Sequence, residues 1–105
     1  MYRATTPPYT YTLPIETSTC KEILVTFKQG CTVINKHYQD GVLPPGMTLN
    51  GKHVYVELTQ EETLKFNEGK SALTQIRVLT SADKAYASKK FGIQIKDVLN
   101  EEILA

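Results

Sequence analysis

The sequence predicts an all-β protein: an immunoglobulin-like β-sandwich of about seven strands, with one short helix between two late strands. Segments of alternating apolar and polar residues recur along the chain, and residues 53–58 (His-Val-Tyr-Val-Glu-Leu) have the period of a half-buried strand. Turn signals such as Asn50-Gly51 separate these segments at the spacing of a sandwich. One capping box, Thr59-Gln60-Glu61-Glu62, predicts a helix. The chain has no tryptophan and so lacks the Cys–Trp–Cys signature of antibody domains, which means that only the fold is predicted to be immunoglobulin-like. A small open barrel is the alternative architecture.

The first three strands follow from alternation and turn residues. Residues 9–13 alternate aromatic or aliphatic residues with threonine, which is typical of a strand. Residues 23–28 place isoleucine, valine and phenylalanine on one face of a second strand. Gln29-Gly30 turns the chain into a third strand, 32–39, and Asp40-Gly41 ends it.

The middle of the chain is predicted to be a hairpin that follows an irregular loop. Pro44-Pro45-Gly46 makes residues 42–46 irregular. Residues 47–49 form a short strand, and Asn50-Gly51 predicts a two-residue type I′ turn into strand 53–58, because both central residues of that turn need φ > 0.

The remaining elements are a helix and two strands. The capped helix is expected to stop at Gly69, where a left-handed residue fits. Residues 72–78 form a long strand, and residues 85–95 form the last one. Lys89 falls on the inward phase of that last strand, so the sequence predicts either a bulge near Lys89-Lys90 or a strand in two pieces.

Length and charge indicate one ordinary globular domain, residues 1–105. The chain has 12 Lys plus Arg against 11 Asp plus Glu, so net charge gives no attraction to nucleic acid or an anionic membrane. The first eight residues contain no apolar run, which argues against a signal peptide or membrane anchor and favours a cytoplasmic chain. In that compartment Cys20 and Cys31 are expected to be reduced thiols.

Four lysines cluster late in the chain. On a strand-rich domain such a run usually marks a solvated face or a strand edge guarded against aggregation. A nucleic-acid-binding barrel that uses these lysines is the weaker alternative. The lysines are Lys84, Lys89, Lys90 and Lys96.

Catalytic and metal-binding chemistry finds little support. A Cys31/His37/His53 metal site is conceivable, but these residues lack the close spacing of structural zinc sites, and both histidines fall on outward phases. The carboxylates of Glu61 and Glu62 point about 100° apart on a helix, and Glu62 is explained by the cap. No phosphate loop or dinucleotide motif is present. We therefore expect a protein that is not an enzyme and needs no cofactor or metal.

Apolar residues beyond those that a sandwich core requires predict a protein interface. Leucines fall on outward phases of two strands, and the chain ends in a segment rich in aliphatic residues. Scattered exposed leucines are normal, whereas leucines gathered on one face form an interaction surface. The candidate interface residues are Leu24, Leu73, Leu79, Val98, Leu99, Ile103 and Leu104.

Four short motifs carry a resemblance that covers nearly the whole chain. They are Thr-Pro-Pro-Tyr-Thr-Tyr-Thr-Leu-Pro at 6–14, Val-Thr-Phe-Lys-Gln at 25–29, Leu-Thr-Gln-Glu-Glu-Thr at 58–63 and Ile-Gln-Ile-Lys-Asp-Val-Leu at 93–99. In these the chain resembles short prophage-encoded virion structural proteins of Gram-positive bacteria. It is more distantly similar to the immunoglobulin-like N-terminal domain of phage baseplate upper proteins. The Pro44-Pro45-Gly46 insertion before the hairpin is not expected in these prophage proteins.

The resemblance implies a structural or adaptor role in a phage tail or baseplate. Its partners would be other virion proteins or further copies of itself, with no nucleic acid and no membrane. The protein would reside in the host cytoplasm during assembly and then in the virion. The alternative is a monomeric domain that recognises a carbohydrate or a host protein through loops, with Tyr38, Tyr86 and Pro44-Pro45 converging at one end.

Overall fold

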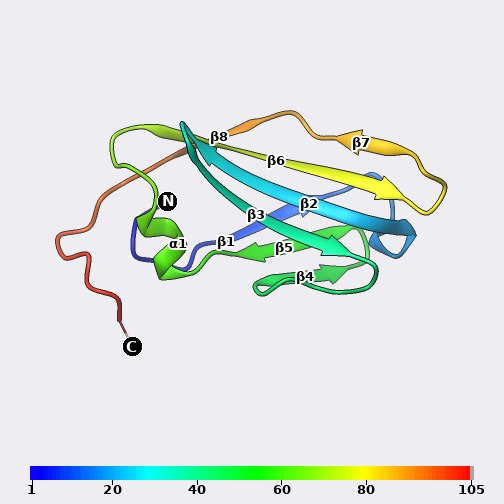
Figure 1. Cartoon of the computed structure of the whole chain (residues 1–105), viewed down its shortest axis with the longest axis horizontal. Helices are drawn as coiled ribbons and strands as arrows, with labels where there is room; N and C mark the ends of the chain where they lie inside the picture. The colour runs from blue at the N-terminus through cyan, green and yellow to red at the C-terminus, as the bar shows by residue number, and fades with distance from the viewer. Residues whose placement is uncertain (105) are drawn as a thin grey trace.

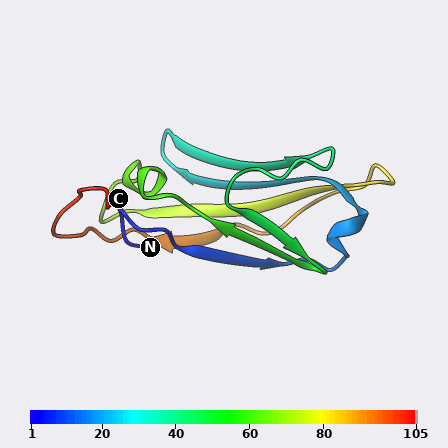
Figure 2. The same ribbon diagram turned by 90° about the horizontal axis from the view of Figure 1, so that it is seen from below.

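Two antiparallel sheets pack face to face in the computed structural model, which describes residues 1–104 (Figure 2). One sheet has the strand order β1-β5-β4, and the other has the order β3-β2-β6-β7, with β8 also paired to β6 (Figure 1). The elements are β1 (Pro8–Thr12), a 3-10 helix η1 (Thr17–Thr19), β2 (Cys20–Gln29), β3 (Thr32–Gln39), β4 (Met47–Asn50), β5 (His53–Glu57), α1 (Gln60–Leu64), β6 (Ser71–Thr80), β7 (Ala85–Ala87) and β8 (Phe91–Gln94).

This strand order confirms the predicted immunoglobulin-like sandwich. In that fold strands A, B, E and D share one sheet, while C, F and G share the other, which gains C′ in variable-type domains. Here β1, β5 and β4 correspond to B, E and D, and β3, β2, β6 and the β7–β8 pair correspond to C′, C, F and G. No strand of residues 1–104 takes the place of strand A beside β1.

The core lies between the sheets, where the alternation of the sequence places it. Ile23, Val25 and Phe27 of β2 are fully buried, as are Val54 and Val56 of β5. Each buried aliphatic or aromatic side chain of this kind contributes roughly 1.5–3 kcal/mol relative to an exposed one. The inward phases predicted for these strands are therefore confirmed.

The hairpin between β4 and β5 has a different turn from the one predicted. Asn50 pairs with His53, so the two turn residues are Gly51 and Lys52. Gly51 has φ +60°, and Lys52 is not among the residues with positive φ. Glycine at the first central position is the pattern of a type II′ turn, so the expectation of type I′ at Asn50-Gly51 was wrong. The turn is shifted by one residue because Asn50 stays paired with His53 as the last residue of β4.

Helix α1 begins as predicted but ends earlier. Thr59 Oγ1 accepts a hydrogen bond from Glu62 N at 3.1 Å, and Glu62 Oε1 accepts one from Thr59 N at 2.9 Å, which completes the capping box. The helix ends at Leu64, not at Gly69, which instead adopts φ +74° in the turn before β6. Phe66, just after the helix, is fully buried.

Replacing Thr59 with alanine is expected to lower the free energy of unfolding by about 1 kcal/mol, because the Glu62 amide loses its cap acceptor. The measurement is urea denaturation followed by circular dichroism. Thr48→Ala, at an exposed site on β4, is the matched control. An unchanged midpoint for Thr59→Ala would show that the cap does not stabilise the fold.

The last predicted strand is divided into β7 and β8 by a bulge, which is why residues 1–104 form eight strands. Thr74 pairs with Phe91 and Arg77 with Ala87, so the two residues between them on β6 face three on the other strand. Ser88 occupies the gap: its N donates to Ile76 O at 2.9 Å, and its Oγ accepts from Ile76 N at 3.1 Å. The predicted interruption near Lys89-Lys90 is confirmed.

Candidate functional site

The three outward leucines lie on one face, the outer face of the five-stranded sheet, which points away from the three-stranded sheet. Leu24 stands opposite Arg77, and Leu79 stands opposite Glu22. Leu24 and Leu79 are half-buried and line one hollow of about 390 Å³ together with Tyr86.

Leu73 shares this face but is not adjacent to the other two leucines. It lies toward the opposite end of β6, about 20 Å from Leu79 at about 3.3 Å per residue. Gln75 and Arg77 separate the two leucines on the same face of the strand. Leu73 is 46% exposed and lines a second hollow with Lys28 and Lys90. The outer face is therefore two small apolar areas with polar residues between them.

The chain after β8 runs to the α1 end of the molecule, where the apolar C-terminal residues lie (Figures 1 and 2). We call residues 97–104 the C-terminal segment. Leu99 is fully exposed, Leu104 is 76% exposed and Ile103 is 45% exposed, while Val98 is half-buried. This fold thus leaves most of the aliphatic surface of the segment uncovered.

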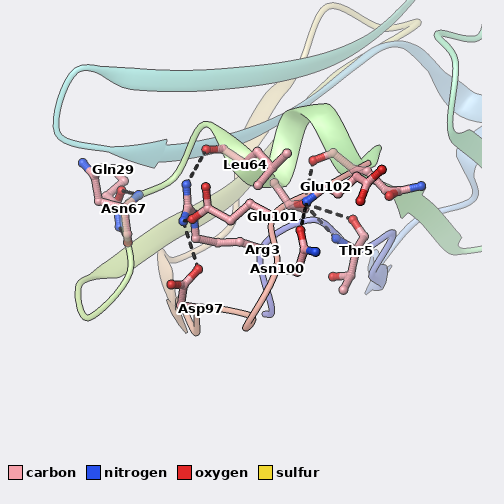
Figure 3. Close-up of polar contacts among 11 residues, drawn as sticks. Arg3, Thr5, Gln29, Leu64, Asn67, Asp97, Asn100, Glu101 and Glu102 are labelled. Carbon is pink, nitrogen blue, oxygen red and sulfur yellow. Dashed lines mark hydrogen bonds and ion pairs between the residues drawn. The ribbon is translucent and has the colours of Figure 1, made fainter. Parts of the chain in front are cut away.

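Arg3 holds the start of the C-terminal segment against α1 (Figure 3). Its Nη1 donates to Asp97 Oδ1 at 3.0 Å and also to Glu101 Oε1, while its Nη2 donates to Leu64 O at 3.0 Å. Burial opposes the charge of Arg3, but the bonds and charges of Glu101 and Asp97 outweigh it and raise the pKa of Arg3. The guanidinium satisfies a carbonyl that the end of the helix would leave unpaired.

Asp97 makes this attachment sensitive to acid. A hydrogen bond from the protonated form of Glu68, whose own pKa is raised by Asp97, together with the neighbouring Val98 amide and Arg3, lowers the pKa of Asp97 below its usual value. A carboxylate with a lowered pKa stabilises the folded arrangement at neutral pH, and this contribution is lost as pH falls through the folded pKa. The raised pKa of Glu68 acts in the opposite direction, so the contact that is expected to weaken in acid is the ion pair between Arg3 and Asp97.

Gln60 holds the other end of the C-terminal segment. Its Nε2 donates to Leu104 O at 2.9 Å, and its Oε1 accepts from Leu104 N at 2.8 Å. Ile103 beside it lines a hollow of about 460 Å³ together with Pro45 and Gly46. The segment is thus attached at both ends mainly by polar contacts, which cover little of its apolar surface.

Lys36 is a buried charge that the sequence analysis did not single out. It lies on the inner face of β3, is 7% exposed, and its Nζ donates to Glu62 Oε1 at 2.9 Å. Burial alone would raise the pKa of Glu62, but the Thr59 amide and Lys36 outweigh it and lower the pKa. The sequence could have indicated this burial, because Lys36 alternates with Ile34 and Tyr38 and so falls on the apolar side of its strand.

The histidines lie on outward phases, as predicted. His37 Nε2 is 3.0 Å from Glu22 Oε1, and His53 Nδ1 is 3.2 Å from Thr12 Oγ1. No group of three side chains suited to a metal ion occurs within residues 1–104.

Cys20 and Cys31 are both free and stand at opposite ends of β2. The ten residues of that strand separate them by about 30 Å, far beyond the reach of a disulfide. Burial raises the pKa of the Cys20 thiol, which keeps it protonated and unreactive.

The loop residues of the alternative binding site do not converge. Tyr38 and Tyr86 align across the sheet through Ile23 and Val78, near the end where β6 finishes. The Pro44-Pro45 loop lies toward the α1 end, where Gly46 O accepts a hydrogen bond from Glu57 N at 2.8 Å. The structure therefore separates the aromatic pair from the proline loop.

Fold and geometry define a β-sandwich of the immunoglobulin-like class with an uncovered apolar segment at one end. Comparisons with protein-family models, with curated proteins and with solved structures gave no match. No helix in the described part of the chain is long and apolar enough to cross a membrane.

Proposed function

We propose that this protein is a non-enzymatic assembly module that joins copies of itself, or related subunits, through its C-terminal segment. The observation that carries the proposal is the exposure of Leu99, Ile103 and Leu104 in a segment attached mainly by polar contacts from Arg3 and Gln60. A phage tail or baseplate is the setting that the sequence resemblance implies. Assembly would then take place in the host cytoplasm and place the protein in the virion, with other virion proteins as neighbours.

Burial of the segment would supply a substantial part of the free energy that association requires. Each aliphatic side chain that becomes buried contributes roughly 1.5–3 kcal/mol. Three per subunit offset a substantial part of the cost of association, which is on the order of 4–15 kcal/mol. Identical subunits around a closed axis repeat the same contact, so the gain recurs at each interface.

Deleting Val98–Ala105 is expected to lower the oligomeric mass while the sandwich still unfolds cooperatively. The core ends at Ile95, which is 2% exposed, so the deletion leaves the two sheets intact. Sedimentation velocity over a range of concentrations measures the mass, and thermal circular dichroism measures the unfolding.

A second variant, Leu99→Ser with Leu104→Ser, should lower the mass in the same way without shortening the chain. Its matched control is Val42→Ser with Leu43→Ser, which removes exposed aliphatic residues from the β3–β4 loop. A full-length protein that stays monomeric at high concentration would refute assembly through this segment.

A further inference from the structure

One edge of β1 has free backbone hydrogen-bonding groups. Pro7 O accepts from Leu58 N at 3.4 Å, and Leu13 N donates to Lys52 O at 2.8 Å, so the odd-numbered residues direct their backbone groups toward β5. The backbone groups of antiparallel strands alternate in direction. The N–H and C=O groups of Thr10 and Thr12 therefore point the other way, and within residues 1–104 no strand pairs with them.

A groove of about 360 Å³ runs along this free edge, beneath β8. Tyr9 and Tyr11 of β1 line one side, and Ile76, Phe91 and Ile93 line the other. Phe91 pairs with Thr74 and so faces the inner side of its sheet, yet it remains 45% exposed. The edge of the larger sheet formed by β7 and β8 extends beyond β1, the edge strand of the smaller sheet (Figure 1). No strand of the smaller sheet therefore covers the inner side of β7 and β8. In an immunoglobulin-like sandwich this position, next to β1, is occupied by strand A.

Two prolines limit how a strand could pair here. Pro8 and Pro14 stand at the two ends of the free edge, at positions whose N–H would point outward, and proline has no N–H. Only Thr10 and Thr12 keep outward donors. The edge therefore accepts a short strand, whereas a long ladder with unrelated chains is prevented.

Charge and shape favour one occupant for this site. The strand segment from Lys84 to Lys96 has four lysines and no acidic residue, so the sheet edge beside the groove is basic although no lysine lines the groove itself, and β1 is uncharged. The C-terminal segment carries Asp97, Glu101 and Glu102 beside its exposed aliphatic residues. On an extended strand Leu99 and Ile103 share one face, because side chains alternate. Arg3 holds the segment beside α1 of its own subunit, and none of residues 97–104 lines the groove of that subunit.

We propose that the C-terminal segment of a second copy of this chain adds to the free edge of β1 as a short strand. The inference rests on the proposed function and names the surface that receives the segment. Thr10 and Thr12 supply the backbone bonds of β-strand addition, and the groove receives the aliphatic side chains. Because the segment and the groove are different surfaces, the contact is heterologous and builds rings or filaments.

The deciding variant is Thr12→Pro, which removes an outward donor while an edge strand tolerates proline. Asp40 N donates to Lys21 O at 3.3 Å, so the odd-numbered residues of β3 point to that strand's free edge, and Val33→Pro is the matched control. Sedimentation should show association at least tenfold weaker for Thr12→Pro and unchanged for Val33→Pro. In the unmodified protein, the amides of Thr10 and Thr12 should exchange more slowly as concentration rises, while the Val33 amide should not change.

The outcomes separate this inference from the proposed function. If the protein assembles, but Thr12→Pro assembles equally well or the amides of Thr10 and Thr12 are not protected, the β1 edge is not the contact and assembly through the segment stands. If the protein is monomeric at every concentration, both proposals fail. If Thr12→Pro does not fold, amide exchange in the unmodified protein decides.

Discussion

Replacing Phe66 with alanine is expected to lower the free energy of unfolding by about 3–5 kcal/mol. Phe66 is fully buried and follows α1, where the chain crosses from β5 in one sheet to β6 in the other. Buried Gln29 holds this crossing in place, since its Oε1 accepts from Asn67 N at 2.6 Å and its Nε2 donates to Asn67 O at 2.9 Å (Figure 3). The surroundings of Phe66 therefore collapse little, and the deletion leaves a cavity.

The measurement is urea denaturation of Phe66→Ala, with Phe66→Leu as a milder variant. Domains of this kind are stable by about 5–15 kcal/mol, so the alanine variant should lose a large part of its stability. Phe91→Ala is the control at an exposed phenylalanine and should change the midpoint little when protein concentration is low. Equal effects at the two positions would contradict the burial of Phe66.

Replacing Gly46 with alanine is expected to be the second most damaging change. Gly46 has φ +83°, which costs a residue with a side chain about 1–2 kcal/mol. A Cβ atom at Gly46 would lie 2.4 Å from Glu57 O, a backbone atom that cannot turn away. Forcing the two apart should cost about 1–3 kcal/mol more and weaken the bond from Glu57 N to Gly46 O.

Gly41→Ala is the matched control for this prediction. Gly41 has a similar φ of +79° but has nothing within 4 Å of the position of a Cβ atom, so it reports the backbone strain alone. Urea denaturation should show a larger loss for Gly46→Ala than for Gly41→Ala. Equal losses would mean that the loop at Pro44-Pro45-Gly46 does not approach β5 as closely as the structure has it.

The alternation of side chains was enough to predict the sandwich and much of its core. Val54 and Val56 are buried because side chains of a strand point to opposite sides in turn. The capping box depends on residues three apart, and it formed as the sequence predicted. The turn at Gly51-Lys52 was predicted one residue out of place, because pairing across the strands decides which residues leave the ladder.

The candidate site depends more on contacts between distant parts of the chain. Outward phase was correct for Leu24, Leu73 and Leu79, but phase does not tell how far apart residues on one face lie. The C-terminal segment was singled out by its aliphatic residues. Its attachment was missed, since Arg3 and Asp97 stand at opposite ends of the sequence and their ion pair follows from the meeting of the two chain ends beside α1.

The sequence by itself determined which residues form strands, which side of each strand faces inward and where the helix begins, because these depend on neighbouring residues. The tertiary structure decided which strand edges stay open, where the C-terminal segment lies and how Lys36 is neutralised by Glu62. Those features arise when residues far apart in the chain are packed together, and the local alternation of apolar and polar residues does not indicate which distant residues will meet.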